Sequence, residues 1–287
     1  MKTVLITGCS PGGIGHELAR EYHSKGCRVI ATARRREALL ELALALGDGL
    51  ETFELDVTDV TSIRAVRDAV ASMTGGTLDV LVNNAGQGYS VPATDVDMDE
   101  VKAVFDVNVF GVMSMVQEFA PLLIASGDGR IVNIGSISGI MPYPFGSAYN
   151  ASKAALHAYG NTLRLEMAPF NVQVTTILTG GVKSNISSHK NRRLVGPDSI
   201  YAPIADILAE RRVARSQSGA MPTSIYAKHI VEGTLRPRVR PWIWKGSFSF
   251  FCWFIDTFVG RTGFDWLFSW NFGLHALRDI LSKQRTD

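Results

Sequence analysis

A tyrosine and a lysine four residues apart, Tyr149 and Lys153, form the pattern with the clearest chemical potential in this sequence. Positions i and i+4 of a helix share a face, so both side chains can point into one site. An unperturbed tyrosine has a pKa near ~10, and an adjacent ammonium group lowers that pKa by favouring the phenolate. Ser136 precedes Tyr149 and could donate a hydrogen bond to a substrate oxygen. The three residues predict acid–base chemistry, whereas an isolated Tyr-x-x-x-Lys pair would lie on a helix surface.

A glycine-rich turn, Thr7–Gly15, lies between the first predicted strand and the first predicted helix. Glycines let backbone N–H groups approach a phosphate, and a helix N-terminus adds a favourable dipole. The turn therefore predicts a dinucleotide site, in which either Gly12 or Gly13 faces the pyrophosphate; a purely structural turn is the alternative. The same residues match G-x-S-x-G, the nucleophile elbow of acyl hydrolases, with Ser10 as the nucleophile. Because this motif follows the first strand and contains the phosphate-binding glycines, a cofactor-binding turn is favoured over a nucleophile elbow.

The end of the second predicted strand carries arginines instead of an acidic residue. No Asp or Glu occurs between Tyr22 and Arg36, and Arg34 stands where a carboxylate would hold the ribose of NAD. A carboxylate repels a 2′-phosphate, whereas an arginine can pair with it. The sequence therefore favours NADPH over NADH, with Arg34 as the selective residue. The alternative is a solvated basic start to the next helix.

The elements that must position these residues alternate between short β-branched runs and longer helical patterns. We predict strands at Val4–Ile6, Arg28–Thr32, Thr52–Leu55, Asp79–Val82, Arg130–Ile134, Val172–Leu178 and Trp242–Trp244. We predict helices at about Gly13–Lys25, Arg36–Leu46, Thr61–Ser72, Glu100–Ser126, Ala148–Ala168 and Thr223–Leu235, the last capped by the Thr223 hydroxyl. Several strands are apolar on both faces. The fold class is therefore α/β, a Rossmann-type doubly wound parallel sheet with helices on both faces.

Composition excludes several classes of protein. The chain has 287 residues, of which 29 are basic and 27 acidic, a balance that argues against nucleic-acid binding. Its three cysteines have no metal-like spacing, so we expect no metal site, no disulfide framework and a reducing compartment. No cleavable apolar segment precedes the first strand. We expect a cytoplasmic protein.

The ordered set formed by Thr7–Gly15, Asn83–Gly86, Asn108, Ser136 and Tyr149-x-x-x-Lys153 resembles the short-chain dehydrogenase/reductase family from residue 3 to about residue 185. The resemblance implies that Tyr149 is the general acid for carbonyl reduction, that Ser136 orients the carbonyl, that Lys153 binds ribose and lowers the tyrosine pKa, and that Asn108 supports a water in a proton relay. It implies that NADPH or NADP+ contacts Gly8, Ser10, Gly13, Ile14, Arg34, Asp56, Val57, Asn84, Ala85, Gly86, Tyr149, Lys153, Val182 and Ser184.

Two departures from the family pattern stand out. The glycine motif is one residue longer than T-G-x-x-x-G-x-G, and Thr179-Gly-Gly-Val182 replaces the usual Pro-Gly, with Ser184 at the usual threonine position. Within the family, the loop Cys9–Gly13, the segments Ala31–Arg35 and Thr179–Lys183, and the aromatic C-terminal segment together resemble fungal NADPH-dependent 1-acyldihydroxyacetone phosphate reductases of lipid metabolism. That likeness implies an oxidoreductase for a hydrophobic ketone. The alternatives are a ketoreductase of a secondary-metabolite or steroid-like pathway, a non-catalytic NADP(H)-binding regulator, and a lipid hydrolase using Ser10.

Two segments bear on the substrate and on partners. Residues 183–221, the lid in this family, carry seven basic and three acidic side chains, a charge of +4 that suits a phosphorylated acyl chain; a solvated helix at Ser199–Arg212 is the alternative. All five tryptophans and eight of the fourteen phenylalanines lie in 242–272. These aromatics predict either peripheral contact with endoplasmic reticulum or lipid droplets, or packing on the domain or at a subunit interface. No run there is long enough to span a membrane.

We accordingly divide the chain into two parts. Residues 1–241 form the NADP(H)-binding catalytic domain with its lid, and 242–287 form an aromatic extension that completes the fold. The helices around Glu100–Ser126 and Ala148–Ala168 form the dimer contact in many members of the family, so the resemblance implies a homodimer or homotetramer.

Overall fold

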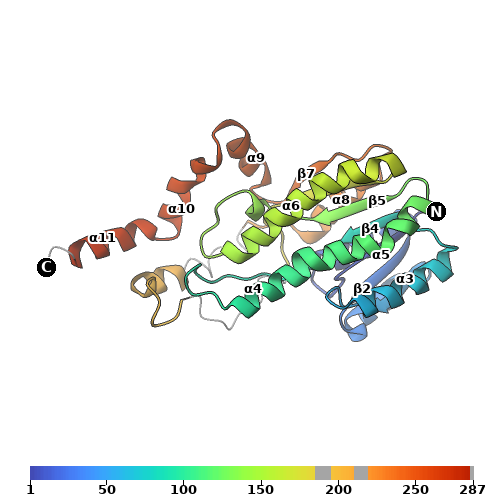
Figure 1. The fold of residues 1–287 in the computed structure, drawn as a ribbon, viewed down its shortest axis with the longest axis horizontal. Coiled ribbons are helices and arrows are strands. Elements are labelled where there is room, and N and C mark those ends of the chain that lie inside the picture. Colours follow the sequence, from blue (N-terminus) through green and yellow to red (C-terminus); the bar gives the residue numbers. More distant parts are fainter. Residues whose placement is uncertain (185–194, 210–218, 285–287) are drawn as a thin grey trace.

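A seven-stranded parallel sheet forms the centre of the computed structural model, which describes residues 1–184, 195–209 and 219–284 (Figure 1). The strands are β1 (Thr3–Ile6), β2 (Arg28–Ala33), β3 (Leu50–Glu54), β4 (Val80–Asn83), β5 (Arg130–Ile134), β6 (Gln173–Thr179) and β7 (Trp242–Lys245). Their order is β3-β2-β1-β4-β5-β6-β7, and every neighbouring pair is parallel. Strand order reverses between β1 and β4, the place where open α/β sheets bind ligands. The predicted fold class is confirmed.

Helices cover both faces of the sheet because successive side chains of each strand point to opposite faces. The helices of the domain are α1 (Ile14–Ser24), α2 (Leu40–Leu46), α3 (Val60–Thr74), α4 (Met98–Phe105), α5 (Gly111–Ala125), α6 (Ser147–Met167) and α8 (Thr223–Thr234). Val4 and Ile6 of β1 face a core shared with α1, α2 and α8. Leu5 faces a second core shared with α3, α5 and α6. This two-sided burial explains why the strands are apolar throughout.

The long helix predicted around Asn108 is interrupted by one π-helical turn. Helix α4 passes into η2 (Asp106–Phe110) and then into α5. Length and composition alone would let the combined stretch Met98–Ala125 cross a membrane, but more than half of its most apolar part is buried within the domain. It is therefore read as a core helix. A π turn inside an α-helix is a frequent feature of functional sites.

The predicted cap of α8 is wrong. Thr223 is the first residue of the helix, Pro222 occupies the N-cap position, and no side chain caps the helix there. The Thr223 hydroxyl donates instead to the carbonyl of Lys183, on the segment that follows β6. The hydroxyl thus joins α8 to the end of the sheet that carries the candidate site.

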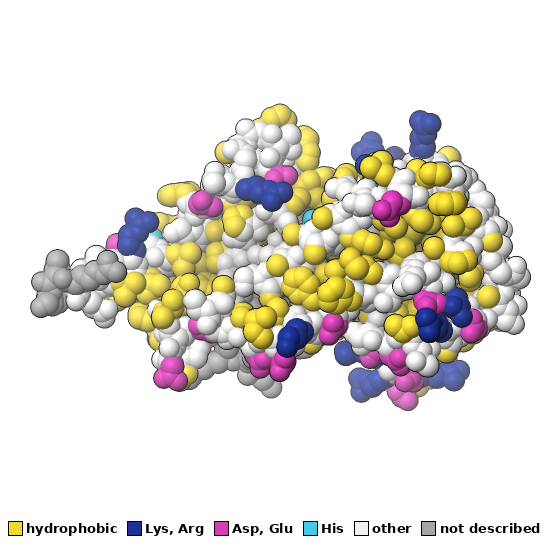
Figure 2. Space-filling model, viewed as in Figure 1, with side chains coloured by type: hydrophobic (Ala, Val, Ile, Leu, Met, Phe, Trp, Pro, Cys, Tyr) yellow, Lys and Arg dark blue, Asp and Glu magenta, His cyan; other side chains and the backbone are white. Residues whose placement is uncertain are grey.

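A C-terminal arm, residues 249–284, extends away from the sheet (Figure 1). It contains α9 (Ser249–Phe258), η7 (Arg261–Phe264), α10 (Asp265–Asn271) and α11 (Leu274–Gln284). Its buried side chains pack against the loop that precedes α6 and against residues 195–208. Hydrophobic side chains also lie on its surface (Figure 2). Strand β7 belongs to the main sheet, so the part that projects begins after it.

Candidate active site

Helix α6 brings Tyr149, Lys153 and His157 onto one face, since the three residues are spaced by four. The hydroxyl of half-buried Tyr149 lies near the side chain of Ser136, which follows β5 and is itself buried. Burial raises the pKa of Tyr149 above its usual value, and the nearby Ser136 hydroxyl partly opposes that rise. Ser136, Tyr149 and Lys153, which the sequence predicted as one group, therefore lie together at the carboxyl edge of the sheet.

Lys153 is buried, with only 4% of its surface exposed. Its Nζ donates to the carbonyl of Ile134 over 2.9 Å and lies 5.9 Å from the centre of the Tyr149 ring. Burial lowers the pKa of Lys153 from 10.5 to about 8, because the charged form loses its hydration. A group with such a pKa can exist with or without its proton near neutral pH.

Asn108 occupies the π turn and is almost completely buried. Its Oδ1 accepts from the backbone N–H of Gln87 over 2.8 Å, and its Nδ2 donates to the Gln87 carbonyl and to Ser152 Oγ over 2.9 and 3.0 Å. A methyl group added to Gly86 would lie 3.3 Å from Asn108 Oδ1 and 3.7 Å from Lys153 Nζ. The Asn108 amide therefore joins the loop after β4 to α6, beside the lysine.

The glycine turn is joined to the loop after β4 by Asn84. The Asn84 side chain donates to the carbonyls of Thr7 and Gly8 over 2.8 and 3.0 Å, and the backbone N–H of Ala85 donates to Thr7 Oγ1 over 2.9 Å. Gly8 has φ +75°, and an added methyl group there would lie 2.9 Å from the Ala85 backbone. A side chain at this position would be both strained and obstructed, so the contact requires glycine.

The extra residue of the glycine motif is accommodated before the helix. Gly12 has φ +71°, whereas Gly13 is extended and is the N-cap of α1, which starts at Ile14. The backbone carbonyl of Ser10, an exposed residue, accepts a hydrogen bond from the Gly13 N–H over 3.1 Å. No histidine in the described part of the chain forms a hydrogen bond with the Ser10 hydroxyl, so the hydrolase interpretation gains no support.

Arg34 lies just after β2 with its side chain exposed. Across residues 1–184, 195–209 and 219–284, no hydrogen bond or ion pair to its guanidinium is found. Asp56 lies beyond β3, where its Oδ1 accepts from the Thr58 N–H and hydroxyl over 2.9 and 2.7 Å, and the neighbouring Val57 is buried. These residues place a free cation and a polar loop beyond the carboxyl ends of β2 and β3.

Val182 and Ser184 follow β6. Val182 forms a bridge with Met221, and the N–H of Lys183 donates to the Met221 carbonyl over 3.0 Å. Ser184 is the last described residue before a gap. Most of the basic residues predicted for the lid, from Lys190 to Arg193 and from Arg211 to Arg215, lie outside the described residues. The predicted helix at Ser199–Arg212 is described only in part, as η6 (Ala202–Ile204) and helical residues 205–209.

Sequence reasoning missed His157. This buried side chain accepts a hydrogen bond from the Ser136 N–H through Nε2 over 3.3 Å. Its position four residues after Lys153, on the same helix face, is the signal that could have found it.

An aromatic cluster joins the C-terminal arm to the loop between Ser136 and Tyr149. The ring centres of Tyr143 and Phe272 are 4.9 Å apart, and those of Phe145 and Tyr201 are 5.1 Å apart. Phe145 is buried although its φ of +61° is unusual for a residue with a large side chain. The arm therefore packs close to the catalytic candidates, as one of the predicted alternatives required.

The exposed side of the arm is also aromatic. Phe250, Phe258 and Trp266 are 72%, 65% and 76% exposed. Contact of these rings with a membrane, or with a second subunit, stays a prediction, as does the cytoplasmic location. No group of metal-binding side chains is present in the portion of the chain that the structure covers.

The chain is similar in sequence to a known family and to several of its members. The family model for short chain dehydrogenases matches residues 2–194. A short-chain dehydrogenase of Pyricularia oryzae is 44% identical over 278 residues, which cover 96% of each chain. The NADPH-dependent 1-acyldihydroxyacetone phosphate reductase of Schizosaccharomyces pombe is 48% identical over 215 residues, covering 74% of this chain and 71% of the relative.

The fold agrees with the sequence comparison. The crystal structure of a short-chain dehydrogenase from Streptomyces avermitilis superposes with a TM-score of 0.78 at 28% identity, covering 99% of this chain and 96% of that one. The sequence matches and the superposition thus agree on one family of oxidoreductases. The chain belongs to the short-chain dehydrogenase family.

Proposed function

We propose that the protein is an NADPH-dependent carbonyl reductase that converts a hydrophobic ketone to a secondary alcohol. The observation that carries the proposal is the grouping of Ser136, Tyr149 and Lys153 at the carboxyl edge of the sheet. The Ser136 side chain lies near the Tyr149 hydroxyl, and the Lys153 ammonium lies 5.9 Å from the centre of the tyrosine ring. A regulator that only binds the cofactor would need none of these contacts.

The three side chains have distinct proposed roles. When bound, the nicotinamide cofactor supplies the hydride for the carbonyl carbon. The Ser136 hydroxyl donates a hydrogen bond to the substrate oxygen, and the Tyr149 hydroxyl transfers its proton to that oxygen as the alkoxide forms. Lys153 in its charged form lowers the pKa of Tyr149 relative to a buried tyrosine alone. The raised pKa of Tyr149 keeps the hydroxyl protonated, as the reductive direction requires.

The residues near the turn fit a dinucleotide. Gly8 lets the turn pack closely against the loop after β4, and Gly13 is the N-cap of α1. Ser10 and Ile14 lie beside this helix N-terminus, whose dipole favours a phosphate. The exposed Arg34 has no competing partner among the described residues, so it is available to a 2′-phosphate. We assign Asp56 and Val57 to the adenine, Asn84, Ala85 and Gly86 to the wall behind the cofactor, and Val182 and Ser184 to the nicotinamide amide.

Asn108 acts indirectly in this proposal. Its amide is engaged by Gln87 and Ser152, so the side chain holds the π turn in place beside Lys153. A contribution to a water-mediated proton relay then falls to the backbone of the turn, where a π turn changes the usual pattern of carbonyl hydrogen bonds.

The substrate class rests on two observations. The aromatic cluster around Tyr143, Phe145 and Phe272 places apolar rings on the loop between Ser136 and Tyr149 and on the arm that packs against it. A relative of 48% identity is named for reducing 1-acyldihydroxyacetone phosphate. We therefore propose an acylated or similarly apolar ketone, with 1-acyldihydroxyacetone phosphate as the first candidate and a ketone of a biosynthetic pathway as the second.

NADPH oxidation should be measured with a panel of ketones, for the wild type beside Tyr149→Phe. The panel contains acyldihydroxyacetone phosphate, a steroid ketone, an aromatic polyketide-like ketone and a short β-keto ester. We expect turnover of an apolar ketone, reduced by about 10²-fold to 10⁴-fold in the variant. NADPH binding without turnover of any ketone would favour the regulator. Ester hydrolysis that Ser10→Ala abolishes and Tyr149→Phe spares would favour the hydrolase.

A further inference from the structure

His157 is a buried imidazole that contacts the backbone of the candidate catalytic serine. Its Nε2 accepts from the N–H of Ser136 over 3.3 Å, and only 6% of the side chain is exposed. The Ser136 hydroxyl accepts from the Ser138 N–H over 3.1 Å, at the start of η3 (Ile137–Gly139). The imidazole therefore lies beneath the turn that presents the Ser136 hydroxyl to Tyr149.

The protonation state of His157 follows from its contacts. A neutral imidazole that accepts through Nε2 carries its single proton on Nδ1. Burial, and then the nearby charges of Lys153 and Arg261, lower the pKa of His157 to about 4. Near neutral pH we therefore expect the His157 imidazole to be uncharged and to accept the hydrogen bond through Nε2.

The surroundings leave little room for another ring position. A methyl group added to Gly135 would lie 2.6 Å from His157 Nε2, and one added to Gly139 would lie 2.6 Å from Cε1. On another side, the His157 and Trp242 rings meet edge to face, with centres 5.7 Å apart. Two glycines on the serine loop and a tryptophan of β7 therefore hold the imidazole in one orientation.

We propose that His157 is a positioning residue for carbonyl reduction, in that its neutral imidazole fixes the Ser136 backbone and so sets the serine hydroxyl against Tyr149. This inference rests on the proposed function. His157 touches neither substrate nor cofactor in this role and transfers no proton. Its contribution comes from one accepted hydrogen bond and from a ring that fits between two glycines.

The test compares His157→Phe with His157→Gln. Phenylalanine keeps a ring of similar size but leaves the buried Ser136 N–H without a partner, whereas glutamine can offer an amide oxygen as acceptor. With the best ketone of the panel, we expect the kcat of His157→Phe to fall by about 10-fold or more, and the KM for NADPH to change by less than about twofold. We expect His157→Gln to regain most of the kcat. Activities are normalised to the folded fraction from thermal melts.

Two results would overturn the proposal. A kcat for His157→Phe within about twofold of wild type would mean that the accepted hydrogen bond does not matter. Equal losses in His157→Gln and His157→Phe, with normal folding, would mean that a hydrogen-bond acceptor at this position does not restore kcat, so the accepted hydrogen bond is not what positions Ser136.

A second readout separates this inference from the proposed function. Nitrogen-15 NMR of histidine-labelled wild-type protein reports the tautomer of each imidazole, and the signal lost in His157→Gln assigns His157. We expect an Nδ1-protonated imidazole that stays neutral down to about pH 5. A charged or Nε2-protonated imidazole at pH 7 would refute the positioning role. The expected tautomer in a protein that reduces no ketone would refute the proposed function and leave the structural contact intact.

Discussion

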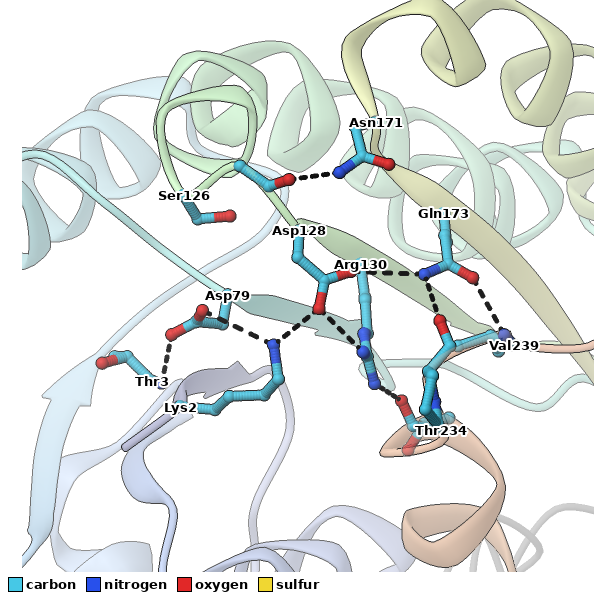
Figure 3. Close-up of polar contacts among 12 residues, drawn as sticks. Lys2, Thr3, Asp79, Ser126, Asp128, Arg130, Asn171, Gln173, Thr234 and Val239 are labelled. Carbon is cyan, nitrogen blue, oxygen red and sulfur yellow. Dashed lines mark hydrogen bonds and ion pairs between the residues drawn. The ribbon is translucent and has the colours of Figure 1, made fainter.

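The two edges of the sheet differ in how their charged side chains are paired. At the edge where the strands begin, Lys2, Asp79, Asp128 and Arg130 form a connected network of ion pairs and hydrogen bonds (Figure 3). At the edge where the strands end, buried Lys153 donates to one backbone carbonyl and has no carboxylate partner among the residues that the structure describes. The first arrangement satisfies its charges, whereas the second leaves a cation with a lowered pKa.

The beginning edge joins elements that are distant in sequence. Arg130 donates to Asp128 over 2.9 Å and to the carbonyl of Thr234 at the end of α8, while Lys2 donates to the same aspartate over 3.0 Å. Gln173 of β6 donates to Asp128 and accepts from the Val239 N–H (Figure 3). This edge therefore holds the strands and α8 together. At the opposite edge the structure describes no carboxylate beside Lys153, in keeping with the general trade-off between stability and function at active sites.

We expect Lys153→Met to have the largest effects, which are opposite in sign for activity and for stability. Under the proposed function, we expect kcat/KM for the ketone to fall by about 10²-fold or more, since the charge beside Tyr149 is lost. The ligand-free protein should become more stable at pH 7, by about 2 kcal/mol, after the buried charge and its one hydrogen bond are both removed. Kinetics and thermal melts of the same preparations test both parts.

The stability gain should depend on pH with a definite sign. Because the pKa of Lys153 falls from 10.5 to about 8 on folding, the unfolded chain binds more protons between these values. Wild-type stability therefore rises through that interval, and the advantage of the methionine variant shrinks above pH 8. An advantage that grows between pH 8 and pH 9.5 would contradict the burial argument.

At the edge where the strands begin, we expect Arg130→Met to have the opposite effects, a loss of stability with little change in activity. Removing the guanidinium leaves the Thr234 carbonyl without its buried donor, while half-exposed Asp128 keeps Lys2, so we expect a loss of about 1 to 3 kcal/mol in unfolding free energy. The kcat per folded molecule should stay within about twofold of wild type. Urea unfolding measures the first quantity, and a large fall in kcat without a loss of stability would break the comparison.

The two ends of strand β2 offer a second comparison between a paired and an unpaired arginine among the described residues. Arg28, its first residue, donates to Glu51 over 2.8 and 2.6 Å, whereas Arg34 just beyond its end has no partner among the described residues. We expect Arg34→Ser to raise the KM for NADPH by about 10-fold without a change in Tm, since a charged contact contributes roughly 1.5 kcal/mol. Arg28→Ser, the matched control, should lower stability by about 1 kcal/mol and leave that KM unchanged.

The smallest effect is expected from Asp128→Asn. Burial alone would raise the pKa of Asp128, but the hydrogen bonds and charges of Lys2 and Arg130 outweigh it and hold the pKa below 3.8. The aspartate therefore stabilises the protein above the pKa of the unfolded chain, and this stabilisation is lost as the pH falls through the folded value. Because the carboxylate is 44% exposed, we expect less than about 1 kcal/mol at pH 6. Urea unfolding at pH 6 and pH 3 should show the variant's deficit shrinking in acid.

Sequence patterns predicted the sheet well because both faces are buried. The run Val4–Ile6 was read as a strand, and pairing with β2 and β4 on either side confirms it. The third strand lies at Leu50–Glu54 instead of Thr52–Leu55, since its register against β2 starts at Val29 and Leu50. Strand ends depend on pairing partners, which one strand's own sequence does not specify.

The site was predicted in its chemistry but not in all of its contacts. Tyr149 and Lys153 are four residues apart, so their shared helix face follows from local geometry. The π turn at Asn108 could not be predicted, because no residue type marks it and its amide partners come from the loop after β4 and from α6. His157 was missed for a similar reason: its role depends on Gly135 and Gly139, which reach it only after the sheet has formed.

The concentration of every tryptophan in β7 and the arm has an optical consequence. Intrinsic tryptophan fluorescence of this protein reports only on the last strand and the segment that projects beyond it. Trp242 meets the His157 ring, while Trp266 and Trp270 are largely exposed, so solvent quenchers will distinguish these populations. Melting curves followed by tryptophan emission and by circular dichroism therefore observe different parts of the molecule. Separate midpoints would reveal an arm that unfolds before the sheet.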